Sequence, residues 1–128
     1  LNHSFSDVVH ALQPGMCLPQ VEQAYLGFDH TALGEGIARR WNFPESIIAS
    51  IAHHHNSSAY QGPQPEVVRC VEVGNLLCTY KNITSVGVKL VTGSRAVLDT
   101  LSLSKDDLVV MASDLEHELA LQADLFKI

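Results

Sequence analysis

Apolar residues recur at intervals of three and four along most of the chain, which is the spacing of helices that bury one face. In residues 30–41 the apolar positions are Leu33, Ile37 and Trp41, with small residues beside them. Asp29 precedes this stretch and suits a helix N-cap, because its side chain can accept a hydrogen bond from the first turn. We therefore predict a helix after Asp29 whose apolar stripe lies in the core, with the large ring of Trp41 buried.

A second helix is predicted from Pro44, because the fixed φ of proline suits the first turn of a helix. The preceding residues, Asn42 and Phe43, interrupt the earlier pattern and form a short turn. The predicted buried stripe of this helix is Ile47, Ile48 and Ile51. The helix ends in three consecutive histidines, residues 53–55, so the turn brings them back toward the start of the first helix.

The rest of the chain predicts further helices and no second domain. We expect short helices over 1–16, 18–26 and about 94–101, and longer ones over 65–81 and after a capping box formed by Ser104 and Asp107. Their predicted inner positions are Val67, Val71, Gly74 and Cys78 in one long helix, and Leu108, Ala112, Leu115, Leu119 and Phe126 in the other. Residues 85–92 alternate and permit a short extended segment. We therefore expect an all-α, compact multi-helix bundle that forms one domain over residues 1–128.

Composition narrows the classes of function. The net charge is −6, with 14 acidic against 8 basic residues, and only Arg39 and Arg40 are adjacent bases. A nucleic-acid surface needs clustered bases, so we expect no direct nucleic-acid partner. No apolar run approaches the roughly 18 residues of a membrane span, so we expect no membrane partner. Three cysteines without a CxxC motif favour a reduced, cytoplasmic protein.

Three histidines are the candidates for chemistry. His30 opens one predicted helix, and His54 and His55 close the next. Imidazole is the commonest metal ligand and titrates near neutral pH. Spacing alone leaves two interpretations open, because His30 also lies on the apolar stripe, where a histidine is usually a hydrogen-bonded core residue. His54 and His55 could equally cap a helix C-terminus, and Asp29 could be only an N-cap.

The order of these residues resembles the HDOD family. Its pattern contains an Asp-His pair, a glycine four residues later, a tryptophan, a Phe-Pro-Glu turn and a closing His-His pair. The matching positions here are Asp29, His30, Gly34, Trp41, Phe43, Pro44, Glu45, His54 and His55. The resemblance covers about residues 22–121 and matches residues 1–21 poorly, which implies the C-terminal, larger part of an HD-like bundle. It also implies that Gly34, Trp41 and Pro44 are structural.

HDOD domains are similar to the HD and HD-GYP metal-dependent phosphohydrolases, and this chain departs from those enzymes. It contains no His-Asp dipeptide and no Gly-Tyr-Pro. Asn56 stands where the HD-GYP enzymes carry a glutamate, and Asn75 where HD enzymes have the last metal-binding aspartate. A neutral amide is a poorer ligand for a hard cation than a carboxylate. The resemblance therefore implies no catalytic residue, metal or cofactor, and a vestigial cluster of His30, His54, His55, Asn75 and Asp29.

These departures favour a non-enzymatic domain, and the resemblance implies a regulatory role in bacterial signalling. Such a domain would act through protein or small-ligand interaction, with other signalling domains or proteins as partners. The alternative is a metal-dependent phosphohydrolase, similar to cyclic-dinucleotide phosphodiesterases, that uses His30, His54 and His55. Its first ligands would lie upstream of Leu1 or among His3, Asp7 and His10, which helical spacing puts on one face. A third hypothesis is an interaction scaffold that binds no small ligand. A His-Asp pair upstream of Leu1 would favour the enzyme.

Overall fold

The computed structural model describes residues 4–84 and 95–122, and every regular element in that part of the chain is a helix, with no strand. The α-helices are α1 (Phe5–Ala11), α2 (Leu18–Leu26), α3 (His30–Arg40), α4 (Glu45–His53), α5 (Pro65–Tyr80), α6 (Arg95–Thr100) and α7 (Lys105–Leu121), and a 3-10 turn spans Ser57–Ala59. The all-α prediction is confirmed. The segment 85–92, for which an extended piece was considered, lies outside the described residues. None of the described helices is long and apolar enough to cross a membrane.

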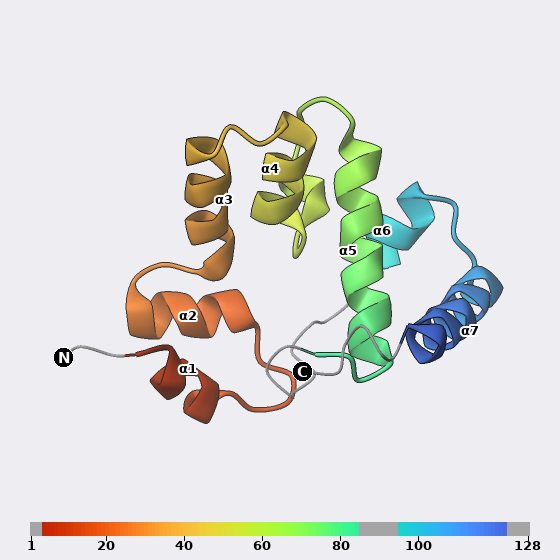
Figure 1. Ribbon diagram of the computed structural model, residues 1–128, viewed down its shortest axis with the longest axis horizontal. Coiled ribbons are helices and arrows are strands. Elements are labelled where there is room, and N and C mark those ends of the chain that lie inside the picture. The colour runs from red at the N-terminus through yellow and green to blue at the C-terminus, as the bar shows by residue number, and fades with distance from the viewer. Residues whose placement is uncertain (1–3, 85–94, 123–128) are drawn as a thin grey trace.

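The helices pack mainly with their neighbours in sequence (Figure 1). α3 and α4 run side by side in opposite directions, and α5 lies against the other side of α4. α2 crosses the lower end of α3, with α1 against it, while α6 and α7 pack on the far side of α5. The bottom ends of α3 and α4 therefore meet between α2 and α5.

Local sequence sets most helix ends as predicted, although α1 was expected over residues 1–16 and spans only Phe5–Ala11. Gly27 ends α2 in the left-handed conformation, with φ of 81°, which glycine adopts without a Cβ clash. The Asp29 side chain accepts a hydrogen bond from the backbone of Ala32 and caps α3. Ser104 and Asp107 form the expected capping box of α7. Pro44 immediately precedes α4.

Two apolar clusters flank α5. The apolar cluster on the α6–α7 side consists of Val73, Leu77, Val97 and Ala112, with leucines of α5, α6 and α7 around it. A smaller cluster on the α4 side contains Ala49, Tyr60 and Val68. Because α5 contributes to both, its buried surface extends around the helix.

The predicted burial of Trp41 is wrong. Trp41 is 66% exposed, and its ring lies edge-on to Phe43, at 6.0 Å between ring centroids. The stripe it ends, with Leu33 and Ile37, is also exposed. The physical reason is that α4 packs against the small-residue side of α3: a Cβ on Gly34 would lie 2.7 Å from Cγ2 of Ile51. Gly34 thus permits the close approach that leaves the larger side chains outside.

The predicted inner faces of α4 and α5 need a similar correction. Ile48 is buried as expected, but Ile47, Val67 and Val71 are exposed. α5 instead buries residues one position further on, including Val68 and Glu72, because α4 and the α6–α7 pair hold it from two sides. In α7, Ala112 is buried as predicted, with Leu108 and Leu115 packed against the same cluster, whereas Phe126 lies outside the described residues.

Candidate functional site

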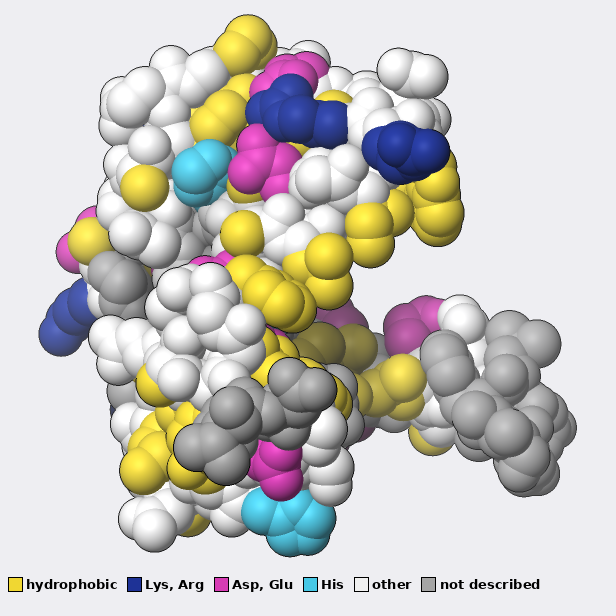
Figure 2. Space-filling model, turned by 90° about the vertical axis from the view of Figure 1, so that its left-hand side faces the viewer, with side chains coloured by type: hydrophobic (Ala, Val, Ile, Leu, Met, Phe, Trp, Pro, Cys, Tyr) yellow, Lys and Arg dark blue, Asp and Glu magenta, His cyan; other side chains and the backbone are white. Residues whose placement is uncertain are grey.

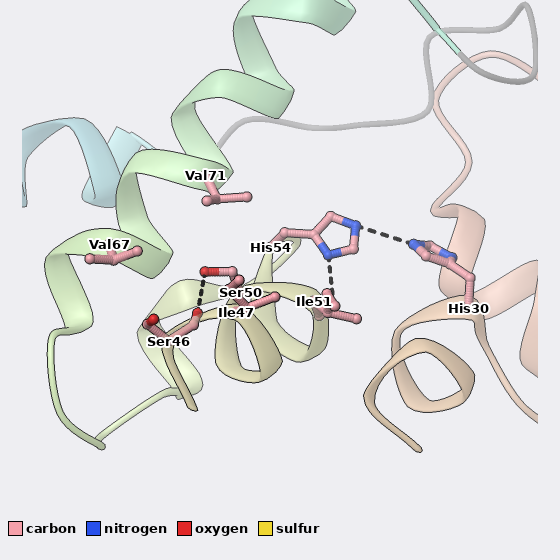
Figure 3. A pocket seen from close by; sticks show the side chains of 8 residues that line it. All are labelled: His30, Ser46, Ile47, Ser50, Ile51, His54, Val67 and Val71. Atoms are coloured by element: carbon pink, nitrogen blue, oxygen red, sulfur yellow. Dashed lines mark hydrogen bonds between the residues drawn. The ribbon is translucent and has the colours of Figure 1, made fainter. Parts of the chain in front are cut away.

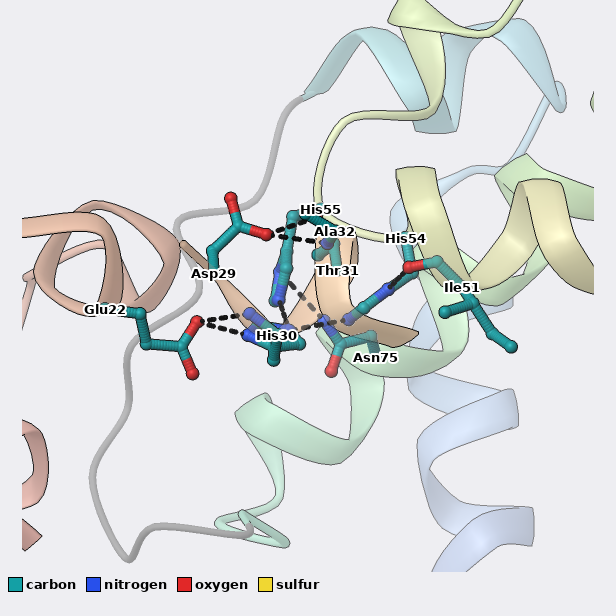
Figure 4. Close-up of polar contacts among 9 residues, drawn as sticks. All are labelled: Glu22, Asp29, His30, Thr31, Ala32, Ile51, His54, His55 and Asn75. Carbon is teal, nitrogen blue, oxygen red and sulfur yellow. Dashed lines mark hydrogen bonds and ion pairs between the residues drawn. The ribbon is translucent and has the colours of Figure 1, made fainter. Parts of the chain in front are cut away.

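His30, His54 and His55 meet where α3 begins and α4 ends (Figure 4). One ring nitrogen from each residue lies within 4.8 Å of the corresponding nitrogens of the other two. The Nε2 atom of His30 is 3.3 Å from Nε2 of His54 and 3.0 Å from Nε2 of His55. The antiparallel α3–α4 pair, joined by its short turn, accounts for this convergence.

Glu22 of α2 fixes the orientation of His30. Its side chain is 2% exposed, and its Oε2 accepts hydrogen bonds from the backbone nitrogen of His30 at 3.0 Å and from Nδ1 at 2.6 Å. Glu22 is not among the site residues predicted from the sequence. A signal was present, because Glu22 lies four residues from both Leu18 and Leu26 and so occupies an apolar position of α2.

The hydrogen bonds of the site form one continuous series of donors and acceptors. A carboxylate only accepts, so Nδ1 of His30 carries a hydrogen and its Nε2, in the neutral ring, is an acceptor. Nε2 of His55 then donates to His30, which leaves Nδ1 of His55 to accept from the Asn75 amide at 3.5 Å. The series of hydrogen bonds therefore runs from Asn75 through His55 and His30 to Glu22. We call these four residues, together with His54, the histidine junction.

His54 occupies a different position in this network. Its Nδ1 donates to the carbonyl of Ile51 at 2.9 Å, so in the neutral ring its Nε2 lone pair faces Nε2 of His30. Two facing acceptors attract a proton or a cation between them. Burial nevertheless lowers the pKa of His54, and burial together with the charges of His54 and His30 lowers the pKa of His55 to about 4. Near neutral pH, His54 and His55 are therefore uncharged.

Asp29 belongs to the edge of this site. Its Oδ1 accepts from the Ala32 backbone at 2.9 Å and from the Thr31 hydroxyl at 2.7 Å, and it is the N-cap of α3. Burial raises the pKa of Asp29, but these hydrogen bonds together outweigh it, so the pKa lies below the ordinary value. The carboxylate is therefore engaged by α3 itself and forms no hydrogen bond with the rings in the described part of the chain.

The other sequence candidates lie elsewhere. Asp7 completes the capping box of α1 with Ser4, and His10 bonds Ser6 within the same helix. His3 lies outside the described residues. Trp41 and Pro44 are at the opposite end of the α3–α4 pair from the histidines.

The donor set decides which metal could be held here. Three neutral imidazoles suit a single zinc or nickel ion. The two hard cations of an HD-type hydrolytic centre need anionic oxygens, and none joins the group of nitrogens that lie within 4.8 Å. Glu22 is directed at the Nδ1 side of His30, away from the Nε2 atoms. The described residues therefore do not fit a two-metal hydrolytic centre.

A groove of about 430 Å³ opens beside the histidines (Figure 3). Its lining residues are His30, Ser46, Ile47, Ser50, Ile51, His54, Val67 and Val71. The hydroxyl of Ser50 is turned back to the carbonyl of Ser46, at 2.7 Å. The groove is therefore mostly apolar along α4 and α5, apart from Ser46 and Ser50, and polar at its histidine end.

Comparisons with known proteins support the sequence resemblance. Residues 3–57 match the family model of the HDOD domain. The fold is similar to a crystal structure of a Marinobacter aquaeolei VT8 protein provisionally described as a signal transduction protein, with a TM-score of 0.61 and 24% sequence identity. That similarity covers 87% of this chain but only 23% of the other chain. No curated protein matches the chain. The match over residues 3–57 confirms the predicted resemblance to HDOD proteins, and it includes residues 3–21, which were expected to match poorly.

Proposed function

We propose that this chain, which is HDOD-like over residues 3–57, is a non-enzymatic regulatory domain of bacterial signalling proteins. In this proposal the histidine junction is a structural remnant of a metal site, and the domain acts by contacting other signalling domains or proteins. We also propose a cytoplasmic location, which is supported by three free cysteines at positions 17, 70 and 78.

One observation carries the proposal: the junction is organised as a hydrogen-bond chain that ends in an amide. Asn75 donates to His55, where a carboxylate would instead accept and make the site anionic. Hydrolysis of a phosphate ester by metals requires a charged ligand set that activates water and offsets substrate charge. The Asn75-to-Glu22 chain instead ties α2, the α3 start, the α4 end and α5 together, which is a structural task.

The signalling assignment is supported by the comparisons. The matched family is HDOD, and the similar structure is described in terms of signal transduction. This chain corresponds to about a quarter of that protein's length, as expected for a module that is combined with others. The activity of any longer protein is part of the proposal and needs its own test.

The experiment is metal analysis of the purified chain combined with a hydrolysis assay. We expect less than one tightly bound manganese or iron per chain and no turnover of a cyclic dinucleotide with either ion added. Retained zinc or nickel would not contradict this, because three imidazoles bind those ions without hydrolytic consequence. Turnover that His54→Ala abolishes would overturn the proposal.

The alternative, a metal-dependent phosphohydrolase, is favoured by one observation. A buried glutamate that orients a histidine is the arrangement that usually supports a metal ligand, and Glu22 does this for His30. Asn75→Asp separates the two functions, because it supplies the missing carboxylate beside His55. If Asn75→Asp gains manganese binding that the parent chain lacks, the parent site is a degenerate one. Manganese binding by the parent at equal affinity favours the enzyme.

A further inference from the structure

One face of α3 is apolar and faces solvent. Leu33, Ile37 and Trp41 follow each other at intervals of four residues and are 52%, 41% and 66% exposed. Figure 2 shows hydrophobic side chains in a row that borders a hollow on one side of the molecule. Contiguous apolar surface of this kind usually marks a contact with another molecule.

Opposite charges stand at the two ends of this face. Asp29 lies at its start and Arg40 at its end, and spacings of three and four place both beside Leu33 and Ile37. The internal hydrogen bonds of Asp29 are accepted by Oδ1, which leaves Oδ2 for another donor. Arg40 is exposed and forms no ion pair within the described residues, whereas its neighbour Arg39 is paired with two glutamates of the same chain.

The charges at the two ends of this face complement those of a second copy when the two α3 helices are antiparallel. If α3 packs against α3 of a second copy in the opposite direction, Asp29 of each copy lies opposite Arg40 of the other. The same register sets Leu33 opposite Gly36, where no atom lies within 4 Å of the position a Cβ would take. It also sets exposed Trp41 opposite exposed Phe28. The two helix dipoles are antiparallel, which is the favourable order.

We propose that this chain forms a two-fold symmetric dimer through α3, with Asp29 paired to Arg40 of the second copy at both ends. A two-fold interface uses the same patch on both copies, so the charges must be arranged head to tail along it, as they are here. An α3 of eleven residues is only about 16 Å long, so the contact is small and the dimer is of the weak, concentration-dependent class. The inference stands independently of the proposed function.

The test is sedimentation equilibrium of the whole chain over a range of concentrations up to about 1 mM, the limit of a weak specific contact. We expect the parent chain to dimerise and Arg40→Glu to raise the dissociation constant about tenfold or more, because it sets like charges opposite each other. Arg39→Gln is the matched control and should leave the dissociation constant unchanged, since Arg39 is paired within its own chain.

A mixing experiment makes the test specific for the predicted register. Asp29→Lys alone should also be monomeric, because lysine then faces Arg40. An equimolar mixture of Asp29→Lys and Arg40→Glu chains restores both opposite-charge pairs and should dimerise. Far-UV circular dichroism checks that Asp29→Lys, which loses the α3 cap, remains folded; if it does not, the Arg40 and Arg39 variants decide alone. A monomeric parent chain, or an Arg40→Glu dimer as tight as the parent's, overturns the proposal and assigns the face to a different protein.

Discussion

The histidine junction and the apolar cluster on the α6–α7 side hold α5 in two different ways. At the junction, Asn75 joins a network in which buried Glu22 and partly buried polar groups satisfy one another through a few hydrogen bonds. At the apolar cluster, Val73 and Leu77 of the same helix pack against α6 and α7 without polar contacts. Polar networks depend on every member, whereas apolar packing distributes its contribution over many contacts. The histidine junction and this apolar cluster should therefore respond differently to mutation and to pH.

The largest effect is expected at Glu22. Glu22 is buried and His30 is partly exposed, and Glu22→Ala leaves two donors of His30 without their acceptor. At about 1–3 kcal/mol for each donor, the change should lower the free energy of unfolding by about 3–5 kcal/mol. Glu22→Gln retains an acceptor and should cost about half as much. Urea unfolding at neutral pH measures both. A loss under about 1 kcal/mol for Glu22→Ala would show that the junction contributes little to stability.

Leu77→Ala probes the apolar cluster. Leu77 is buried among Val73, Val97 and Ala112, so truncation should cost about 2–4 kcal/mol from lost contacts and the cavity left behind. The loss should be the same at pH 5 and pH 7.5, because none of these groups titrates. A loss that changes with pH would mean that the two regions are coupled through α5.

The pH dependence of stability should come from the junction. The pKa of His55 is about 4 in the folded protein, against an ordinary value of 6.5, and that of His54 is also lowered. Between these two pKa values the unfolded chain binds more protons than the folded protein. The contribution of these histidines to the free energy of unfolding is therefore fully present above pH 6.5 and is lost as the pH falls toward 4. Since the rings are partly exposed, we expect a loss of about 1–2 kcal/mol for His55.

Urea unfolding of His55→Gln over the same pH range isolates this contribution. The variant should show a flatter stability profile than the parent chain. His117→Gln, on an exposed position of α7, is the control and should preserve the parent profile. Parallel profiles for the parent chain and His55→Gln would exclude His55 as the source.

The smallest effect is expected at Trp41. Had its ring been buried, Trp41→Ala would cost about 3–5 kcal/mol; with the ring 66% exposed, we expect under about 1 kcal/mol. Trp41 is the only tryptophan, so its fluorescence reports on this position alone. Emission should be that of a solvated indole in dilute protein. A blue-shifted emission that quenchers cannot reach, in the dilute monomer, would show that the ring of Trp41 is buried.

Local sequence predicted the helices well because their ends depend on residues close in the chain. Gly27, Asp29 and the Ser104–Asp107 capping box act within one turn of backbone, so their effect can be inferred without knowing the fold. The periodicity could not tell which side of a helix faces its neighbour. Leu33, Ile37 and Trp41 form a regular stripe, yet the contact with α4 uses the adjacent small residues.

The candidate site, like the helices, was predicted in part from local sequence and depends in part on the packing of the helices. The sequence by itself determined the helical fold, the helix ends and the identity of His30, His54 and His55 as candidates, because each of these follows from local spacing and motif order. The resemblance also placed Asn75 with these histidines. Only the tertiary structure decided that Glu22 completes the site and that Asn75 donates to His55, at 3.5 Å. Those contacts join different helices, across eight residues for Glu22 and His30 and across 20 residues for His55 and Asn75. Hydrogen bonds depend on distances of tenths of an ångström, which packing of all the helices sets together.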